Sequence, residues 1–409
     1  MGQSAAPAAS QVPTGCAKER WMTRPDTKVP PLLAAQTVDA RAAETGVLRV
    51  DLDAIAGNWR ALAERVAPAA CGAVVKADAY GLGVGRILPA LAAAGCGTFF
   101  VATPREAAEA RALNSRVRIF VLDGLFPGSA DDILAASAIP CLASMAELEE
   151  WSGFARRIGV RLPAALHLDS GLNRLGLPKG EVQRLAGRLE LLEPLDLVLV
   201  MSHLASADDP SDPANAAQRE AFVALRALLP RAPASLAASD GLMLGPAFHF
   251  DLVRPGYALY GGQAFRGERA PVSTAVSLHA RVLQVRDIAA GDAVGYSGAW
   301  RATRASRIAT IAAGYADGFA RTASASNGVP GGSVNVHGAR LPIVGRISMD
   351  LVTVDVTDCP VPVARGDLAE LIGPALPLET AGAEARTIGY EVLTRLGRRF
   401  QLVYVGGGA

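Results

Sequence analysis

The feature that most constrains this fold is a rhythm that begins near residue 47, in which short apolar runs alternate with longer segments of helical periodicity. The runs are continuous in apolar residues, as expected of strands in a parallel sheet that is covered on both faces. Eight runs stand out, at residues 73–78, 98–103, 118–123, 139–144, 164–169, 196–204, 234–239 and 249–256.

The segments between these runs repeat Leu, Ala or Phe at three- and four-residue steps, the spacing of one helix face. The clearest are residues 85–95, 105–113, 144–159 and 215–229, and Ser144 with Glu147 fits a capping box at the start of the third. Eight strands, each followed by a helix, is the count of a (β/α)8 barrel of about 250 residues. We therefore predict an α/β fold with a TIM-type barrel over residues 47–285.

The helical periodicity nearly disappears after residue 286, where β-like runs punctuated by Gly and Asp take over. These runs predict a C-terminal, mainly-β domain over residues 286–409. Residues 1–46 are rich in Ala, Pro and Thr and contain no apolar run typical of a secretory signal. We expect them to form a disordered N-terminal arm, and we expect the protein to be cytoplasmic.

Charge and composition narrow the range of partners. Lys and Arg number 40 against 39 Asp and Glu, so the chain has no broad field that would attract nucleic acid or an anionic membrane. The expected partners are small molecules and further copies of the chain. The five cysteines and five histidines are dispersed and form no paired motif, so we expect no bound metal and no redox pair.

Lys76 is the most informative single residue, because it lies within the apolar run AVVKAD at the predicted carboxyl end of the first barrel strand. Active sites of such barrels lie at that end. Burial of an amine lowers its pKa and favours the neutral form that a Schiff base requires. The run alone fits equally well a lysine whose ammonium group emerges into solvent.

The ends of the last two predicted strands offer groups that bind phosphate. Ser239 ends the seventh run, and Gly256 follows the eighth, where barrels commonly hold phosphate on backbone N–H groups. As isolated signals they would be ordinary turn residues.

Six motifs in order and register resemble those of the alanine racemase family, a pyridoxal-phosphate barrel followed by a β-domain. They are VVKADAYG (74–81), DSGLNRLG (169–176), SHLASAD (202–208), VRPGYALYG (253–261), GYADGF (314–319) and GRISMD (345–350). The resemblance covers roughly residues 47–405. It implies a homodimeric isomerase that interconverts L- and D-alanine on a pyridoxal 5'-phosphate aldimine and supplies D-alanine for peptidoglycan.

The resemblance also assigns roles to individual residues. It implies that Lys76 forms the aldimine, that Arg254 faces the pyridine nitrogen, and that Leu122 and His203 border the cofactor ring. It places Arg174 near the cofactor's phenolic oxygen and the substrate carboxylate. The residues implied to contact the phosphate are Tyr80, Ser239, Gly256, Tyr257 and Tyr390.

Racemisation removes a proton from one face of Cα and returns one to the other, so two groups must flank the reaction centre. The resemblance implies that Lys76 serves one face and that Tyr296 of the neighbouring subunit serves the other. It further implies that Tyr315 and Met349 shape the mouth of the neighbouring subunit's pocket and contact the substrate. From composition alone, Tyr296 would be an aromatic plug in a turn and Met349 a core residue.

An arginine beside the ring nitrogen has a chemical consequence. A guanidinium has a pKa above 12, so Arg254 can donate to the nitrogen without protonating it. The unprotonated ring is a weaker electron sink, and stray protonation that leads to transamination is discouraged.

The sequence departs from the family at one position near the site. Many members carry a lysine that becomes carbamylated seven residues before the arginine matching Arg174, whereas this chain has His167. A neutral imidazole cannot supply a carbamate's charge, so an anion or an ordered water would have to replace it.

Three alternatives remain open from the sequence. A racemase of broader range differs only in pocket volume, which discriminates by about 1–3 kcal/mol per methylene. A decarboxylase with the same architecture is disfavoured by Arg254, because that reaction profits from an acidic partner at the ring nitrogen. A non-catalytic cofactor-binding module would not need the residues that follow 286.

Overall fold

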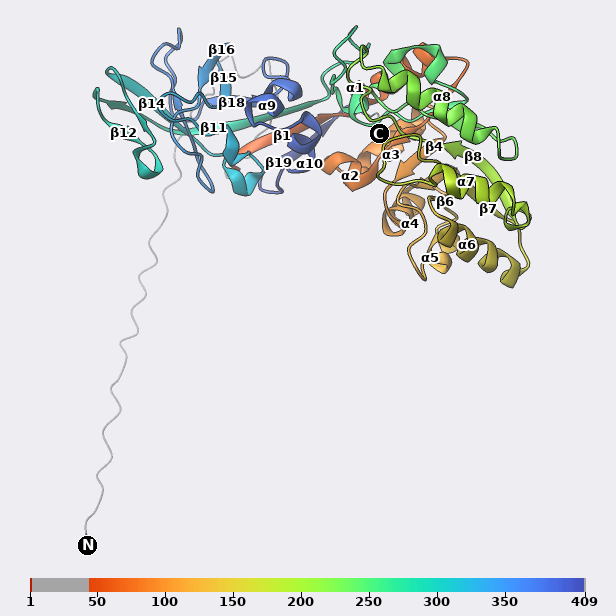
Figure 1. The fold of residues 1–409 in the computed structure, drawn as a ribbon. Helices are drawn as coiled ribbons and strands as arrows, with labels where there is room; N and C mark the ends of the chain where they lie inside the picture. Colours follow the sequence, from red (N-terminus) through yellow and green to blue (C-terminus); the bar gives the residue numbers. More distant parts are fainter. Residues whose placement is uncertain (2–43, 408–409) are drawn as a thin grey trace. The chain divides into compact units, whose positions relative to one another are not determined.

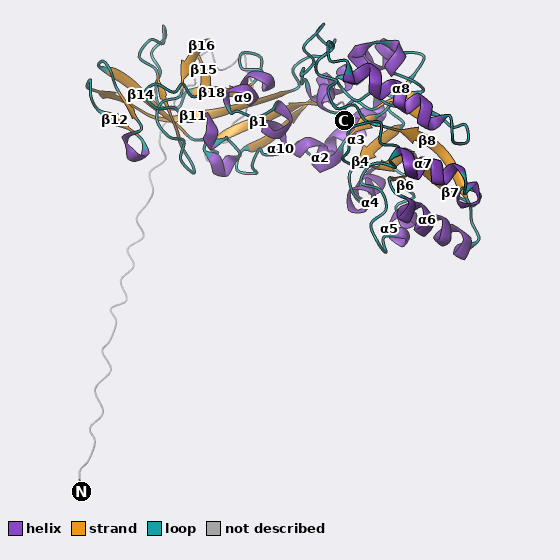
Figure 2. Cartoon of the chain, viewed as in Figure 1, coloured by secondary structure: helices purple, strands orange, loops and turns teal. Residues whose placement is uncertain are grey.

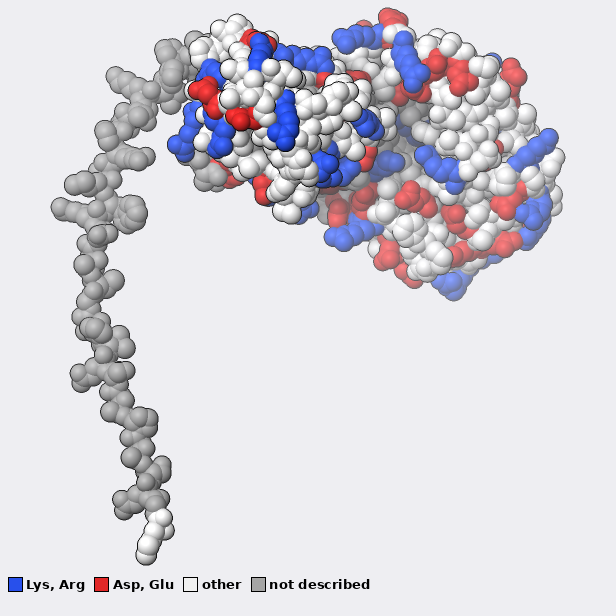
Figure 3. All heavy atoms as spheres, turned by 60° about the vertical axis from the view of Figure 1, so that its left-hand side comes forward, with Lys and Arg blue, Asp and Glu red and all other residues white. Residues whose placement is uncertain are grey.

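The computed structural model describes Met1 and residues 44–407. The arm predicted for residues 1–46, with Cys16, therefore lies outside the described residues apart from Met1 and residues 44–46. Of the helices that are described, none combines the length and apolarity needed to cross a lipid bilayer. Figure 3 shows acidic and basic side chains interspersed over the face in view, as expected for a chain with nearly balanced charge.

The predicted parallel barrel is confirmed (Figure 1). All eight apolar runs contain a strand. Strands β3 to β9 pair side by side in chain order, and β10 pairs with β2, which directly precedes β3. The bridge between Ala238 and Arg254 links the end of β9 to β10 and so completes the ring. The strands are β2 (Ala70–Cys71), β3 (Ala73–Val74), β4 (Thr98–Val101), β5 (Arg118–Val121), β6 (Ile139–Leu142), β7 (Leu162–His167), β8 (Leu195–Met201), β9 (Ala234–Ser235) and β10 (Leu252–Val253).

Helices connect these strands, and all four clearest amphipathic segments are helical. Ser144 caps α6 by accepting the Glu147 N–H, as predicted, while the Glu147 carboxylate accepts from the Ser144 hydroxyl. The helices are α1 (Leu52–Val66), α2 (Lys76–Gly81), α3 (Val84–Ala93), α4 (Pro104–Leu113), α5 (Ala130–Ala135), α6 (Met145–Ile158), α7 (Lys179–Ala186) and α8 (Ala214–Arg226).

The C-terminal part is mainly β, as predicted, and Figure 2 shows strands dominating it where helices dominate around the barrel. Short helices α9 (Leu378–Glu384) and α10 (Gly389–Thr394) pack together at its side. The strands are β11 (Val276–Ile288), β12 (Ala293–Val294), β13 (Trp300–Arg301), β14 (Ser306–Ile311), β15 (Ser333–Val336), β16 (Ala339–Pro342), β17 (Val352–Asp355), β18 (Leu368–Ile372) and β19 (Gln401–Val405).

The first described strand, β1 (Gly46–Asp51), belongs to this C-terminal sheet and not to the barrel. It pairs antiparallel with β11 and parallel with β19. The predicted barrel limits at residues 47 and 285 therefore both fall inside strands of the C-terminal sheet. The apolar pattern shows that β1 is buried but carries no information on its partner, because both sheets bury Val and Leu in the same way.

The fold brings three distant segments together at Asn58, a buried residue of α1. Its side-chain amide donates to the carbonyls of Leu259 (3.0 Å) and Ser273 (2.9 Å), and its oxygen accepts the Ser273 N–H at 2.7 Å. Asn58 thus ties α1 to the end of the barrel and to the segment that leads into β11.

We expect Asn58→Ala to lower the free energy of unfolding by about 1–3 kcal/mol, because it leaves buried backbone groups without partners. Urea denaturation measures the loss. The matched control is Arg60→Ala on an exposed position of the same helix, which should stay within about 0.5 kcal/mol of the wild type. Equal effects of the two changes would contradict this role of Asn58.

Candidate active site

A cavity of about 720 Å³ opens at the carboxyl ends of the barrel strands. Its volume lies in the range of small-molecule sites. The structure brings together in its lining every residue predicted to bind the cofactor except Tyr257, namely Lys76, Tyr80, Leu122, Arg174, His203, Ser239, Arg254, Gly256 and Tyr390. Tyr390 and its neighbours on α10 belong to the C-terminal domain, so both domains line the cavity.

Lys76 lies two residues beyond the end of β3, which stops at Val74 and not at residue 78 as predicted. Residues 77–80 then all adopt left-handed backbone conformations, with φ between 52° and 60°. Such conformations cost non-glycine residues roughly 1–2 kcal/mol each. The turn leaves Lys76 half-buried in the cavity lining and directs Tyr80 into the same lining.

Two carboxylates stabilise this left-handed turn. Glu106 accepts the N–H groups of Ala77 (2.9 Å) and Ala102 (2.7 Å), which joins the turn to the end of β4. Asp78 accepts the N–H of Val84 at 2.7 Å and so connects the turn to the start of α3. The strained turn that follows Lys76 is therefore bonded both to the end of β4 and to the start of α3.

Ser239 and Gly256 form a cradle of polar groups next to Tyr80. The Ser239 hydroxyl accepts the backbone N–H groups of Gly256 (3.0 Å) and Ala258 (3.2 Å). A Cβ atom at position 256 would lie 2.4 Å from the hydroxyl oxygen of Tyr80, so only glycine leaves that hydroxyl its place. The cradle thus combines two hydroxyls with two backbone N–H groups.

The side chain of Tyr257 lies outside the cavity lining, and its contact with the phosphate stays a prediction. Its hydroxyl donates to Glu379 on α9 at 2.9 Å, and its ring stacks on Tyr390 with centroids 3.9 Å apart. The Tyr390 hydroxyl, which does lie in the cavity lining, donates to Asp240 at 3.0 Å. Tyr257 therefore supports Tyr390 from behind.

Arg254 is almost completely buried, with 2% exposure. Its guanidinium donates to the Ser202 carbonyl at 2.7 Å and to the Ser235 hydroxyl, both at the ends of barrel strands. Burial lowers the pKa of Arg254 to about 10, so the side chain remains charged at neutral pH. The cavity is thus lined by a fixed cation held by neutral acceptors.

The two histidines of the site are held neutral. Burial, followed by the nearby Arg254 and Arg174 cations, lowers the pKa of His167 to about 4 and that of His203 to about 3. His167 is 5% exposed, and its Nδ1 atom is buried without a hydrogen-bond partner. Arg174 lies nearby on an exposed loop that is shaped by Asp169, whose carboxylate accepts three successive backbone N–H groups.

The three residues predicted to act in a neighbouring subunit lie on the chain's own C-terminal domain and outside the cavity lining. Tyr296 is 67% exposed, Met349 54% and Tyr315 42%. Their turns touch one another: Arg346 donates to the Ser297 hydroxyl at 3.1 Å, and the Tyr315 N–H donates to the Ser348 carbonyl at 3.1 Å. We call these three residues the exposed triad.

Comparisons with known proteins identify the family. Residues 50–264 match the family model of the alanine racemase N-terminal domain, and residues 275–404 match that of the C-terminal domain. The chain belongs to the alanine racemase family. An alanine racemase of Acidiphilium cryptum is 50% identical over 87% of this chain and 98% of that protein, and a catabolic alanine racemase of Mesorhizobium japonicum is 44% identical over 91% and 98%.

Solved structures of alanine racemases have the same fold. That of Bartonella henselae, with covalently bound pyridoxal phosphate, has a TM-score of 0.84 at 42% identity and covers 88% of this chain and 99% of that one. The biosynthetic enzyme of Pseudomonas aeruginosa has a TM-score of 0.82 at 34% identity and covers 89% and 100%. The chain is therefore an enzyme of a pyridoxal-phosphate-dependent racemase family.

The residues in the cavity fit pyridoxal phosphate. An aldehyde requires a primary amine, which Lys76 supplies, and the ring nitrogen requires a donor, which Arg254 supplies. A phosphate requires hydrogen-bond donors, and the Ser239 and Tyr80 hydroxyls supply them beside the Gly256 backbone.

Two acidic residues that no sequence motif marks accept hydrogen bonds from the tyrosines of this site. Asp240 receives the Tyr390 hydroxyl, and Glu379 receives that of Tyr257. Burial raises the pKa of Asp240. Asp240 directly follows Ser239, the predicted phosphate ligand, and that adjacency was the available signal. Glu379 had no signal, because its partner lies 122 residues away in sequence.

We expect His167→Gln to flatten the pH dependence of stability between pH 6.5 and about 4. In that window the unfolded chain binds a proton at residue 167 that the folded chain does not, because the pKa is lowered from 6.5 to about 4. In the wild type, His167 should therefore make the free energy of unfolding fall as the pH decreases, by up to about 1.4 kcal/mol per pH unit. The His167→Gln variant should lack this contribution. Urea denaturation of both proteins at equal cofactor loading measures this slope, and identical slopes would contradict it.

Proposed function

We propose that this enzyme interconverts L- and D-alanine through two opposed bases, Lys76 of one subunit and Tyr296 of a partner subunit. The observation that carries the proposal is that the predicted site residues fall into two separate groups on the chain. One end of the barrel gathers the cofactor residues in a single cavity, while the exposed triad of Tyr296, Tyr315 and Met349 lies on the C-terminal domain and outside that cavity. A second copy of the chain supplies the missing side of the site.

Pyridoxal phosphate, when bound, stabilises the negative charge that proton removal leaves on the substrate Cα. The chain's own residues fix its position. Lys76 holds the aldehyde end, Arg254 donates to the ring nitrogen, and the cradle of Ser239 and Gly256 binds the phosphate.

The two bases divide the proton transfers. Lys76 serves the face from which the D-isomer loses its proton, and Tyr296 of the partner subunit serves the L-face. The Tyr296 hydroxyl must be deprotonated in one direction and protonated in the other. Positioned acid and base groups of this kind contribute about 10²–10⁴-fold each.

Arg254 favours proton return to Cα over transamination. It remains charged, since burial lowers its pKa only to about 10, and it is already held by the Ser202 carbonyl and the Ser235 hydroxyl. A donor that keeps its proton leaves the ring nitrogen neutral and limits the spread of charge into the ring.

The exposure of the triad supports a homodimer. Two aromatic rings and a methionine side chain in exposed turns are an unfavourable surface for a monomer, and these residue types are enriched at protein interfaces. A twofold arrangement covers both triads at once, because the same patch occurs on each copy. We place this reaction in the cytoplasm, where it supplies D-alanine for peptidoglycan.

We expect Tyr296→Phe to reduce racemisation by about 10²–10⁴-fold, since the hydroxyl that moves the proton is gone. The absorbance of the lysine-bound cofactor should be unchanged, because the Lys76 amine that binds the cofactor and the cavity residues around it are intact. D-alanine formation and the absorbance spectrum measure the two effects. Lys76→Ala is the matched control and should lose both. Full activity of Tyr296→Phe would remove this tyrosine from the mechanism.

We expect a mixture of Lys76→Ala and Tyr296→Phe subunits to regain activity, although each variant alone is inactive. A mixed dimer has one site with both residues intact, so random exchange in equal amounts restores about one quarter of wild-type sites. Activity measured after subunit exchange tests this. No recovery, with exchange verified by a mass tag, would show that Lys76 and Tyr296 act within one chain.

A further inference from the structure

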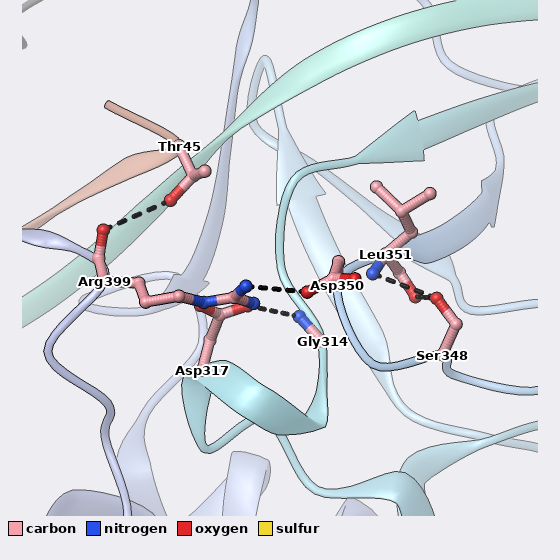
Figure 4. Close-up of polar contacts among 7 residues, drawn as sticks. All are labelled: Thr45, Gly314, Asp317, Ser348, Asp350, Leu351 and Arg399. Atoms are coloured by element: carbon pink, nitrogen blue, oxygen red, sulfur yellow. Dashed lines mark hydrogen bonds and ion pairs between the residues drawn. The ribbon is translucent and has the colours of Figure 1, made fainter. Parts of the chain in front are cut away.

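Tyr315 and Met349 lie on two separate turns that one guanidinium joins. Arg399 donates to both carboxylate oxygens of Asp317, at 2.7 and 2.8 Å, and to one oxygen of Asp350 at 2.7 Å (Figure 4). Asp317 is two residues after Tyr315, and Asp350 directly follows Met349. The Tyr315 and Met349 turns are therefore both bonded to the Arg399 side chain.

The Asp317 end of this network is buried. The Asp317 side chain is 2% exposed, and its carboxylate also accepts the Gly314 N–H at 2.8 Å. A bidentate pair between a guanidinium and a buried carboxylate is a strong and directional contact, in contrast to most surface ion pairs. The carboxylate in turn raises the pKa of Arg399, so the guanidinium stays charged.

The two turns also approach each other closely in their backbones. The Ala316 N–H donates to the Met349 carbonyl at 2.9 Å. A Cβ atom at position 314 would lie 2.3 Å from that same carbonyl oxygen, so the approach depends on Gly314. The backbones of the Tyr315 and Met349 turns are thus in direct contact.

Arg399 itself is anchored by the C-terminal sheet. It lies just before β19, which pairs with β1, and its carbonyl accepts the Thr45 hydroxyl at 3.4 Å. The nearby Gly397 N–H donates to the Asp317 carbonyl at 2.8 Å. The network therefore connects the two turns to the rigid sheet of the domain.

We propose that Arg399 is a positioning residue for substrate binding in the partner subunit, because it fixes the Tyr315 and Met349 turns through Asp317 and Asp350. The inference rests on the proposed function, in which these turns form the mouth of the neighbouring cavity. Arg399 touches neither the substrate nor the cofactor. It acts by fixing the relative positions of the two turns whose residues contact the substrate.

The proposal predicts where Arg399→Gln acts. Glutamine lacks the charge and the fork that reach both carboxylates. We expect kcat/KM for L-alanine to fall by about 10²-fold, mostly through a higher KM, since a displacement of about 1 Å at a binding group has this effect. The cofactor absorbance should be unchanged. Arg304→Gln removes an exposed ion pair with Asp358 in the same domain and serves as the matched control, with unchanged KM.

Subunit mixing locates the effect in the partner's site. Arg399→Gln mixed with Lys76→Ala should produce sites of wild-type KM, because the intact C-terminal domain then serves the intact Lys76. Arg399→Gln mixed with Tyr296→Phe should produce only sites of raised KM. The proposal would be overturned if the mixture with Tyr296→Phe contained sites of wild-type KM. It would also be overturned if neither mixture contained such sites. Failure of Lys76→Ala to complement Tyr296→Phe would instead overturn the shared site itself.

A second variant covers the case in which Arg399→Gln does not fold. Asp350→Asn leaves the pair of Arg399 with buried Asp317 intact and alters a carboxylate whose side chain is 55% exposed. It should raise KM by a smaller factor than Arg399→Gln does. Its mixtures with Lys76→Ala and with Tyr296→Phe should show the same pattern of KM values. An unchanged KM in Asp350→Asn would also overturn the proposal.

Discussion

A buried guanidinium organises the cavity of this enzyme. Arg254 is enclosed at the carboxyl ends of the barrel strands, where only carbonyl and hydroxyl oxygens accept its hydrogen bonds in the described part of the chain. Its charge, added to the effect of burial, keeps His167 and His203 neutral. A permanent cation beside neutral imidazoles can donate a hydrogen bond to a ligand atom without transferring a proton to it. Racemisation requires this at the ring nitrogen of the cofactor, which must stay unprotonated.

The second constraint is that one chain does not gather all the groups that racemisation needs. The barrel supplies an amine, a phosphate cradle and the ring contacts, and the C-terminal domain displays a phenol, a second tyrosine and a methionine to solvent. The sheet whose strands β14 and β17 flank Tyr315 and Met349 in sequence also contains β1, the first strand of the described chain, so this domain is joined to both ends of the barrel. A second base that is attached to its own barrel through this domain completes a site only if a twofold partner presents the same surface in return.

The sequence predicted the barrel because its strands are buried on both faces and its helices on one, and both patterns are local. It predicted most of the cavity residues because motifs place them at strand ends. It did not predict the four left-handed residues after Lys76, since only Asp78 among them is of a type that visits that conformation, and Glu106 from another segment helps to stabilise the turn. The rotation of Tyr257 toward Glu379 and the Arg399 network depend on contacts 122 and 82 residues apart, which no periodicity records.

The central claim is that the two bases serve opposite faces of the substrate, and isotope exchange in Tyr296→Phe tests it most directly. The variant is incubated separately with D-alanine and with L-alanine in D₂O, and deuterium at Cα and chirality are measured together. The account predicts that D-alanine acquires deuterium with retention, because Lys76 still serves that face, while L-alanine acquires almost none. Equal exchange into both isomers, or exchange into L-alanine alone, would contradict it.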